Sequence, residues 1–237
     1  MKISICVPMY NESSIIGNTA IELHNYMSSH YGDDYEIIFS DDGSRDDSAE
    51  IVRSLNLPCV KVVGYDKNKG KGCAVRHAVL SSKGEIVIFT DADLAYGLDV
   101  IDSAVALLEN KEYNVLVASR AKHPDGYAGY TPIRKLASKT YLKILNLFVG
   151  IKISDAQCGF KGFCGDVGRK LFSLCQTDNF AFDLEVILLA QKMGMHIYEM
   201  PATIINHRES KVNLIKDAPK MLKEALLIKK RVKNLKI

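Results

Sequence analysis

The sequence predicts an α/β fold in which a mostly parallel central sheet is flanked by helices and forms a single domain. Short apolar runs alternate with longer stretches of helical periodicity, which is typical of βαβ units. The 237 residues, 47% hydrophobic and 25% charged, suit one such domain. No apolar run has the length of a membrane span, and the first residues do not resemble a signal peptide. Six scattered cysteines form no C-x-x-C pair, which favours reduced thiols and a cytoplasmic location.

The elements follow one another in a regular order. "ISICV" predicts a buried strand, a helical stretch follows it, and "YEIIFS", "VKVVG" and "EIVIFT" repeat the alternation. After Arg120 the Gly- and Pro-rich stretch "AKHPDGYAGYTP" interrupts this rhythm before a long helix. We therefore expect strands at residues 3–7, 35–40, 60–64, 85–90, 115–119 and 196–200, and helices at 13–30, up to 55, up to 82, 133–148, 167–175 and 182–193.

Polar clusters stand where three of these strands end. Asn11 and Glu12 follow the first strand, Asp41 and Asp42 the second, and Asp91 and Asp93 the fourth. In open α/β sheets ligands bind outside the carboxyl ends of the strands. The sequence therefore predicts a binding site at this edge.

The pair Asp91 and Asp93 indicates a divalent metal ion. Residues two apart in an extended chain point to the same side, so the two carboxylates repel each other unless a positive charge lies beside them. Mg²⁺ commonly takes one or two carboxylates and completes its shell with water and substrate phosphates. The alternative is a turn that only caps a helix.

The stretch "NKGKGCAVR" indicates contact with phosphate. It is no Walker A loop, and Val75 replaces the third glycine of a dinucleotide fingerprint. Lys71 and Arg76 nevertheless flank backbone that glycine leaves open. The alternative is a solvated basic turn. Without a loop for a γ-phosphate, a nucleotide sugar suits the chain better than a nucleoside triphosphate.

Six segments of the sequence occur in the following order: "VPMYNE", "SDDGSRDDS", "NKGKGCAVRHA", "DADLA", "ASR" and "DAQCGFK". Together they resemble family 2 glycosyltransferases of the GT-A fold, and most of all the dolichyl- and polyprenyl-phosphate glucosyltransferases and mannosyltransferases, closer to the glucosyl side. The resemblance implies a GT-A domain with a Rossmann-like nucleotide-binding half at residues 1–212. A basic amphipathic helix would follow at 213–237.

The resemblance also implies roles for individual residues. The donor would be a nucleotide-diphosphate sugar bound with Mg²⁺ or Mn²⁺, and Asp91 and Asp93 would hold the ion. The nucleotide pocket would contain Pro8, Tyr10 and Glu12, with Asp41 or Asp42 reading the base, and Arg120 and Gln157 would lie near the donor. The acceptor phosphate would meet Arg134, Ser138, Arg208, Ser210 and Lys211, although Glu209 stands where the family usually has glycine.

Enzymes of this family invert the anomeric centre. A sugar-hydroxyl acceptor needs a carboxylate base, and the candidates are Asp183 and Glu185 in "FAFDLEVI". A lipid phosphate is already ionised and needs none. A structural role for Asp183 is the equal alternative to a catalytic one.

The end of the chain bears on the acceptor. Residues 208–237 contain ten lysines or arginines and three acidic residues. Met221, Ala225, Ile228, Val232 and Leu235 share one helical face. This face would lie in a membrane interface near anionic lipid, or dock on the protein's own core or on a second subunit in a homo-oligomer.

We therefore expect a hexosyltransferase that uses a donor like UDP-glucose or GDP-mannose. It would act on a polyprenyl or dolichyl phosphate as a peripheral protein at the cytoplasmic membrane face. The alternatives are a transferase for a sugar hydroxyl in cell-surface polysaccharide synthesis and a non-catalytic module that binds nucleotide sugars. No nucleic-acid partner is expected.

Overall fold

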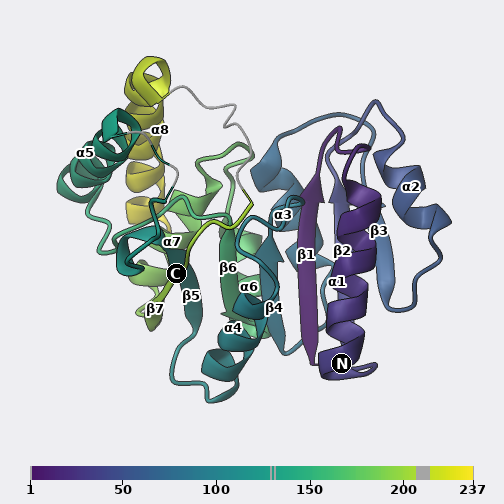
Figure 1. Ribbon diagram of the computed structural model, residues 1–237. Helices are drawn as coiled ribbons and strands as arrows, with labels where there is room; N and C mark the ends of the chain where they lie inside the picture. Colours follow the sequence, from purple (N-terminus) through teal and green to yellow (C-terminus); the bar gives the residue numbers. More distant parts are fainter. Residues whose placement is uncertain (1, 129, 131, 207–213, 237) are drawn as a thin grey trace.

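A seven-stranded sheet forms the centre of the molecule (Figure 1), in the order β3-β2-β1-β4-β6-β5-β7. The computed structural model describes residues 2–128, 130, 132–206 and 214–236. All strand pairs are parallel except the two that involve β6, which runs antiparallel to β4 and β5. The strands are β1 (Ile3–Met9), β2 (Tyr35–Asp41), β3 (Val60–Gly64), β4 (Ile86–Thr90), β5 (Val115–Ser119), β6 (Phe160–Cys164) and β7 (Ile197–Pro201). The predicted α/β class and the mostly parallel sheet are confirmed.

Helices cover both faces of the sheet, each over its own apolar core. One core lies under α1 (Ile16–Tyr31), α2 (Ser48–Ser54) and α4 (Asp99–Glu109). The other lies under α3 (Lys71–Leu80), α5 (Pro132–Val149), α6 (Gly165–Leu174), α7 (Phe182–Lys192) and α8 (Leu214–Asn234). A short 3₁₀ turn, η1 (Arg120–Lys122), follows β5.

Two elements were absent from the sequence-based expectation. No helix was expected between residues 90 and 115, where α4 lies, and no strand was expected in "DAQCGFKGF", which contains most of β6. β6 reads "FKGFC", with a lysine and a glycine at its centre, so it lacks the alternation of a half-buried strand. Because β6 runs antiparallel, its first residue Phe160 pairs with Thr90, the last residue of β4. The segment before β6 therefore lies at the same sheet edge as Asp91.

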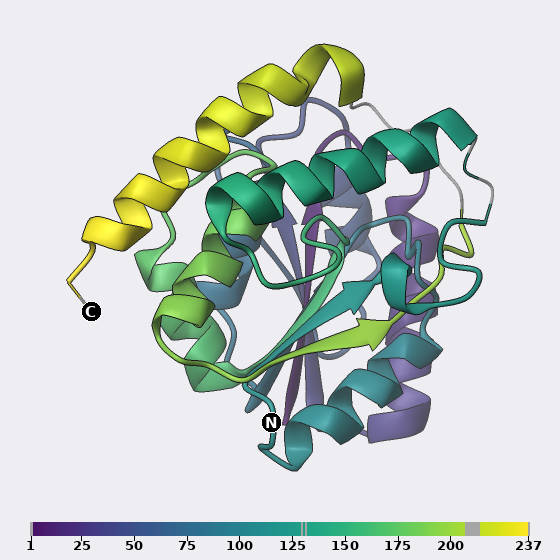
Figure 2. The same cartoon turned by 90° about the vertical axis from the view of Figure 1, so that its left-hand side faces the viewer.

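Helix α8 packs against the rest of the protein. Figure 2 shows it beside α5 on one face of the sheet, and it also contacts α7. Ala225, Ile228 and Val232 are at most 5% exposed and belong to the core. The expectation that this apolar face lies in a membrane is therefore wrong, and the docking alternative holds. Within the described parts of the chain, no helix is long and apolar enough to cross a membrane.

Candidate active site

The loops after β1 and β2 are joined by hydrogen bonds. The amide of Asn11 donates to Ser44 Oγ at 3.0 Å, and the amide of Arg45 donates to Asn11 Oδ1 at 2.8 Å. The amide of Glu12 donates to Ser48 Oγ at 2.8 Å. These bonds give the end of the sheet at β1 and β2 a single, connected rim.

The predicted nucleotide residues lie along this rim. Pro8 is buried in β1 opposite Ser40, and the half-buried Tyr10 follows the end of the strand. Asp41 is the last residue of β2, where its Oδ1 accepts a hydrogen bond from the amide of Ser44 at 3.1 Å. Pro8, Tyr10, Glu12 and Asp41 thus share one end of the sheet, and their contact with a nucleotide stays a prediction.

Asp42 holds the loop that follows β3. Its buried carboxylate accepts hydrogen bonds from the Tyr65 hydroxyl at 2.7 Å and the Asn68 amide group at 2.8 Å. It also accepts the backbone amides of Lys69 at 2.8 Å and Gly70 at 2.9 Å. A carboxylate that is 3% exposed and has this many donors is committed to holding the loop. Of the two candidates for reading the base, Asp41 is therefore the one that we retain.

Asp91 lies between a cation and a glycine. Lys71 Nζ, at the start of α3, is 2.5 Å from Asp91 Oδ1. On the other side lies Gly159, where an added Cβ would come within 2.0 Å of Asp91 Oδ2. Burial alone would lower the pKa of Lys71, but the charges of Asp91 and Asp183 hold it above its ordinary value. Lys71 is thus a charged partner of the first carboxylate of the pair.

The turn that carries Asp91 and Asp93 is not a helix cap. The amide of Leu94 donates to Asp91 O at 3.0 Å, and Leu94 adopts a left-handed φ of 46°. The amide of Ala95 donates to Asp93 Oδ1 at 3.2 Å. Helix α4 begins at Asp99, six residues after Asp93, and has no side-chain cap. The turn therefore does not cap a helix, which was the structural alternative to a ligand site.

A second acid–base pair is buried behind Lys71. Asp183 Oδ1 is 2.5 Å from Lys161 Nζ, which also donates to Cys158 O at 2.8 Å. Burial raises the pKa of Asp183, Lys161 and Lys71 oppose that rise, and Asp91 adds to it. The charges of the two pairs therefore act on one another. Lys161 was not among the residues predicted for the site. A lysine within the apolar run "GFKGF" is nevertheless a signal, because a buried ammonium needs a partner.

Arg120 is held by the segment before β6. Its Nε and Nη2 lie 2.6 and 2.8 Å from the two oxygens of the buried Asp155, and its Nη1 donates to the Tyr130 hydroxyl at 2.8 Å. The backbone amide of Gln157, a half-buried residue, donates to Asp155 Oδ1 at 3.3 Å. The "DAQCGFK" segment, residues 155–161, thus contacts Arg120 through Asp155, Asp91 through Gly159 and Asp183 through Lys161.

Two predicted residues point elsewhere. Arg76 pairs with Asp178 and donates to Cys175 O at 3.3 Å. It is five positions after Lys71, so it lies on another side of α3. Glu185 is two positions after Asp183 on α7 and accepts from the amide of Thr177 at 2.7 Å and from Arg231 Nη2 at 2.7 Å. The structure therefore does not place Arg76 or Glu185 with Asp91.

The residues predicted to bind the acceptor phosphate lie in α5 and after residue 206. Arg134 and Ser138 lie in α5, but their side chains are not among the described ones. Arg208, Ser210 and Lys211 lie outside the described residues. Their proposed contact with an acceptor phosphate stays a prediction.

The carboxylates of Asp91 and Asp93 suit a hard divalent ion that shares its shell with phosphate oxygens. The ammonium of Lys71 beside Asp91 shows that this carboxylate already faces a positive charge. Among the described residues, no three His, Cys, Asp or Glu side chains form a group that could hold a metal. Two carboxylates suit an ion that takes its other ligands from water and substrate phosphates.

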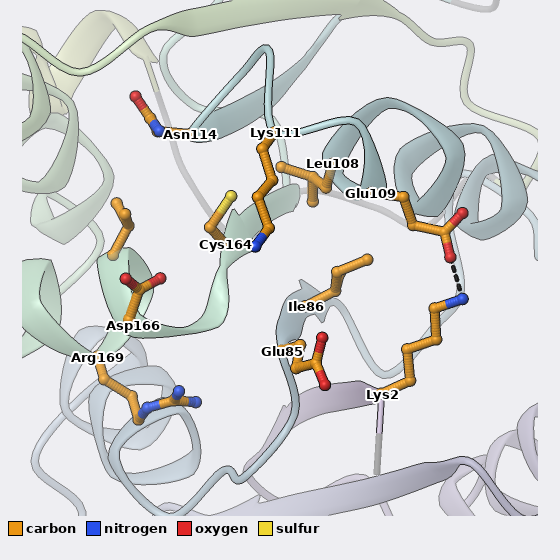
Figure 3. Close-up of a pocket in the computed structure, with 11 residues that line it drawn as sticks. Lys2, Glu85, Ile86, Leu108, Glu109, Lys111, Asn114, Cys164, Asp166 and Arg169 are labelled. Atoms are coloured by element: carbon orange, nitrogen blue, oxygen red, sulfur yellow. Dashed lines mark ion pairs between the residues drawn. The ribbon is translucent and has the colours of Figure 1, made fainter.

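A separate cavity of about 580 Å³ lies at the opposite end of the sheet (Figure 3). It is lined by residues at the start of β4 and the end of β6, together with Lys2, Glu109, Lys111 and Arg169. Lys2 forms an ion pair with Glu109, and Arg169 donates to Gly84 O at 3.0 Å. Its charges are mixed, and it contains none of the predicted site residues.

Comparison with known proteins relates the chain to glycosyltransferases. The family model "Glycosyl transferase family 2" matches residues 4–172. A dolichyl-phosphate beta-glucosyltransferase of Trichomonas vaginalis is 33% identical over 88% of this chain and 65% of its own length. The dolichyl-phosphate beta-glucosyltransferase of Saccharomyces cerevisiae is 27% identical, over 96% of this chain and 74% of its own. Glycosyltransferase AglD of Haloferax volcanii is 28% identical, over 92% and 35%. The chain thus spans part of each relative's length.

Solved structures show the same fold. Glucosyl-3-phosphoglycerate synthase of Mycobacterium tuberculosis, in complex with Mn²⁺, UDP-glucose and phosphoglyceric acid, has a TM-score of 0.71 at 18% identity and covers 99% of this chain and 81% of its own. Mannosyl-3-phosphoglycerate synthase of Rubrobacter xylanophilus has a TM-score of 0.65 at 18% identity, over 100% and 77%. At this identity the likeness concerns the fold alone.

Proposed function

Because the chain belongs to glycosyl transferase family 2 and has the GT-A fold, we propose that it transfers glucose from a nucleoside-diphosphate sugar to a polyprenyl or dolichyl phosphate. The observation that carries the proposal is the meeting of residues 155–161 with Asp91, Asp183 and Arg120 at one end of the sheet. The names of the Trichomonas and yeast relatives support glucose and a lipid phosphate over the other members of the class.

The donor would bind across the rim formed by β1, β2 and β4. Tyr10 and Asp41 would face the nucleoside, and Asp91 and Asp93 would hold Mg²⁺ or Mn²⁺ with the diphosphate. When bound, such an ion stabilises the negative charge that develops on the leaving nucleoside diphosphate. Lys71 would add a second positive charge on the same side. Arg120, held rigid by Asp155, would fix the sugar or its phosphates.

A phosphate acceptor would attack the anomeric carbon from the face opposite the nucleotide, which inverts that centre. It is ionised at neutral pH, so no base has to remove a proton. Asp183 fits this chemistry as a positioning residue, since its carboxylate is buried in an ion pair with Lys161. Glu185 is engaged by Arg231 and has no part in the proposed reaction.

A sugar-hydroxyl acceptor remains the second candidate because of one observation. The pKa of Asp183 is raised by burial, and a raised pKa suits a general base near neutral pH. The two candidates differ in the product that they form.

The test uses the purified chain with UDP-glucose or GDP-mannose, Mn²⁺, and either a short-chain polyprenyl phosphate or a free sugar. We expect glucose transfer to the lipid phosphate, and loss of transfer when EDTA is present. Transfer to the free sugar alone would support the second candidate. Donor binding without any transfer, with either acceptor, would favour a non-catalytic module.

The acceptor lipid would place the protein at a membrane, and the surface involved differs from the one predicted. Leu147 and Phe148 in α5 and Leu226 and Leu227 in α8 are between 42% and 78% exposed. The two helices meet there, because Lys229 Nζ donates to Phe148 O at 2.8 Å. Exposed lysines surround these side chains: Lys143, Lys223, Lys229 and Lys230. Such a surface suits anionic lipid.

Sedimentation with anionic liposomes tests this surface. Replacing Leu226 and Leu227 together by serine should lower binding by about tenfold, and added salt should lower it further. Leu80→Ser, at an exposed apolar position on α3, is the matched control and should change nothing. Equal binding by all three proteins would contradict the assignment.

A further inference from the structure

Lys71 forms an ion pair with Asp91, the carboxylate that would bind a metal ion in the proposed function. Its ammonium lies 2.5 Å from Asp91 Oδ1, while the other oxygen faces the backbone at Gly159. Both side chains are partly exposed, by 21% for Lys71 and 31% for Asp91. A divalent ion that approaches Asp91 therefore reaches an oxygen that is already paired with a positive charge.

The backbone of Lys71 is closely packed, whereas its side chain is 21% exposed. Gly70, just before it, adopts a φ of 110°, and its amide is held by the carboxylate of Asp42. An added Cβ at Gly70 or Gly72 would come within 2.6 Å of the backbone of residues 177 and 178. The loop is thus closely packed on both sides of Lys71. Only the four-carbon stem of the lysine leaves room for its charge to move.

Two further carboxylates act on the ammonium of Lys71. The charges of Asp183 and Asp93 act on Lys71 in addition to that of Asp91. Asp183 has its own cation, Lys161, which is fully buried and cannot leave. Lys71 therefore lies in the field of three carboxylates and is the more exposed of the two lysines. A divalent ion at Asp91 would repel the Lys71 ammonium, and a diphosphate would attract it.

We propose that Lys71 is a resident counterion of Asp91 that a divalent ion must displace, and that the displaced ammonium then binds the diphosphate of the donor. The inference rests on the proposed function, which supplies the ion and the diphosphate. It gives the two ligands an order. Metal alone binds weakly because it competes with Lys71, and metal with nucleotide binds well because the nucleotide gives the ammonium a new partner.

The test measures Mn²⁺ binding without nucleotide, from the electron paramagnetic resonance signal of the free ion. Lys71→Gln should bind Mn²⁺ about three- to tenfold more tightly than the wild type, since the competing ion pair is gone. Lys71→Arg, which keeps the charge, should resemble the wild type. Lys67→Gln removes an exposed lysine from the same loop and controls for net charge, and Asp91→Asn should abolish binding.

A second measurement uses UDP in saturating Mn²⁺, followed by calorimetry. Here Lys71→Gln should bind about tenfold more weakly than the wild type, so one substitution strengthens one ligand and weakens the other. Circular dichroism verifies that each variant is folded.

Unchanged, weaker or absent Mn²⁺ binding by folded Lys71→Gln overturns the inference, as does an equal gain in Lys67→Gln. These outcomes are separable from a failure of the proposed function, which would appear as transfer that ignores EDTA. An enzyme that needs metal for transfer, but whose Lys71→Gln variant binds Mn²⁺ like the wild type, would refute the resident counterion alone.

Discussion

The turns after β2 and β4 both place two carboxylates at the same end of the sheet, yet they treat them differently. Asp42 is 3% exposed and receives hydrogen bonds from the hydroxyl, amide and backbone groups of one loop. Asp91 is partly exposed, and the flexible side chain of Lys71 meets its charge. A carboxylate surrounded by fixed donors has a structural task, whereas one that faces a movable cation is available to a ligand.

Asp93→Asn should lower the rate of glucose transfer by about a thousandfold or more, because a ligand of the proposed metal loses its charge. The free energy of unfolding should hold or rise slightly, since repulsion between neighbouring carboxylates falls. Steady-state kinetics and urea denaturation measure the two effects. Asp66→Asn, an exposed acid in the loop after β3, is the control and should leave both unchanged. Near-normal transfer by Asp93→Asn would show that the turn after β4 has a structural task and does not bind a metal ion.

Gly159→Ala should lower transfer by about a hundredfold, because the new methyl group would take the place of Asp91 Oδ2 and turn the carboxylate away. The same substitution at Gly194, which has open space but a φ of 68°, should cost about 1 kcal/mol of stability through strain and leave transfer intact. If Gly159→Ala loses no more activity than Gly194→Ala, contact with Asp91 is not what requires the glycine.

Asp42→Asn should lower the free energy of unfolding by about 2 kcal/mol, since an amide cannot accept all the donors that the carboxylate accepts. Donor binding should weaken as a consequence, because loop 65–70 carries the chain into Lys71. Thermal unfolding with and without UDP measures both. A variant with wild-type stability and impaired nucleoside binding would show instead that Asp42 reads the base.

Glu185 is a second carboxylate with a structural task, and its contribution to the free energy of unfolding depends on pH. Burial acts to raise its pKa, but hydrogen bonds from Thr177 and the charge of Arg231 hold it below the ordinary value of about 4.5. The folded state therefore favours the charged form, so this stability is present above pH 4.5 and is lost as the pH falls further. Glu185→Gln should be about 2 kcal/mol less stable at pH 7 and should show less acid dependence below pH 4.5. Parallel acid-unfolding curves for the two proteins would contradict this assignment.

Much of the fold could be predicted because alternating apolar and amphipathic segments are a local property of the chain. Helix α4 has the same local signal, in Ile101, Ala104, Val105 and Leu108, and could have been found. Strand β6 could not, because its pairing with β4 and β5 is what makes "FKGFC" a strand. Sequence periodicity likewise identified the apolar face of α8 but not what covers it.

The sequence predicted that acidic residues gather at one edge of the sheet. It did not predict which residues each of them contacts. The choice between Asp41 and Asp42 depends on the loop at residues 65–70, and the choice between Asp183 and Glu185 depends on Lys161 and Arg231. These contacts join residues that are distant in sequence, so neither spacing nor composition reveals them. Arg76 shows the same limit, since Asp178, its partner, lies about a hundred residues away.

The position of β6 between β4 and β5 has a consequence for biosynthesis. Both neighbours precede β6 in the chain, so a nascent polypeptide that ends after β5 has the outer edge of β4 and both edges of β5 without partners. Such open strand edges readily pair with other chains and promote aggregation. The ribosome must therefore release some 45 further residues before the sheet closes between them. A fragment cut between β5 and β6 should accumulate in inclusion bodies, whereas the full chain should not.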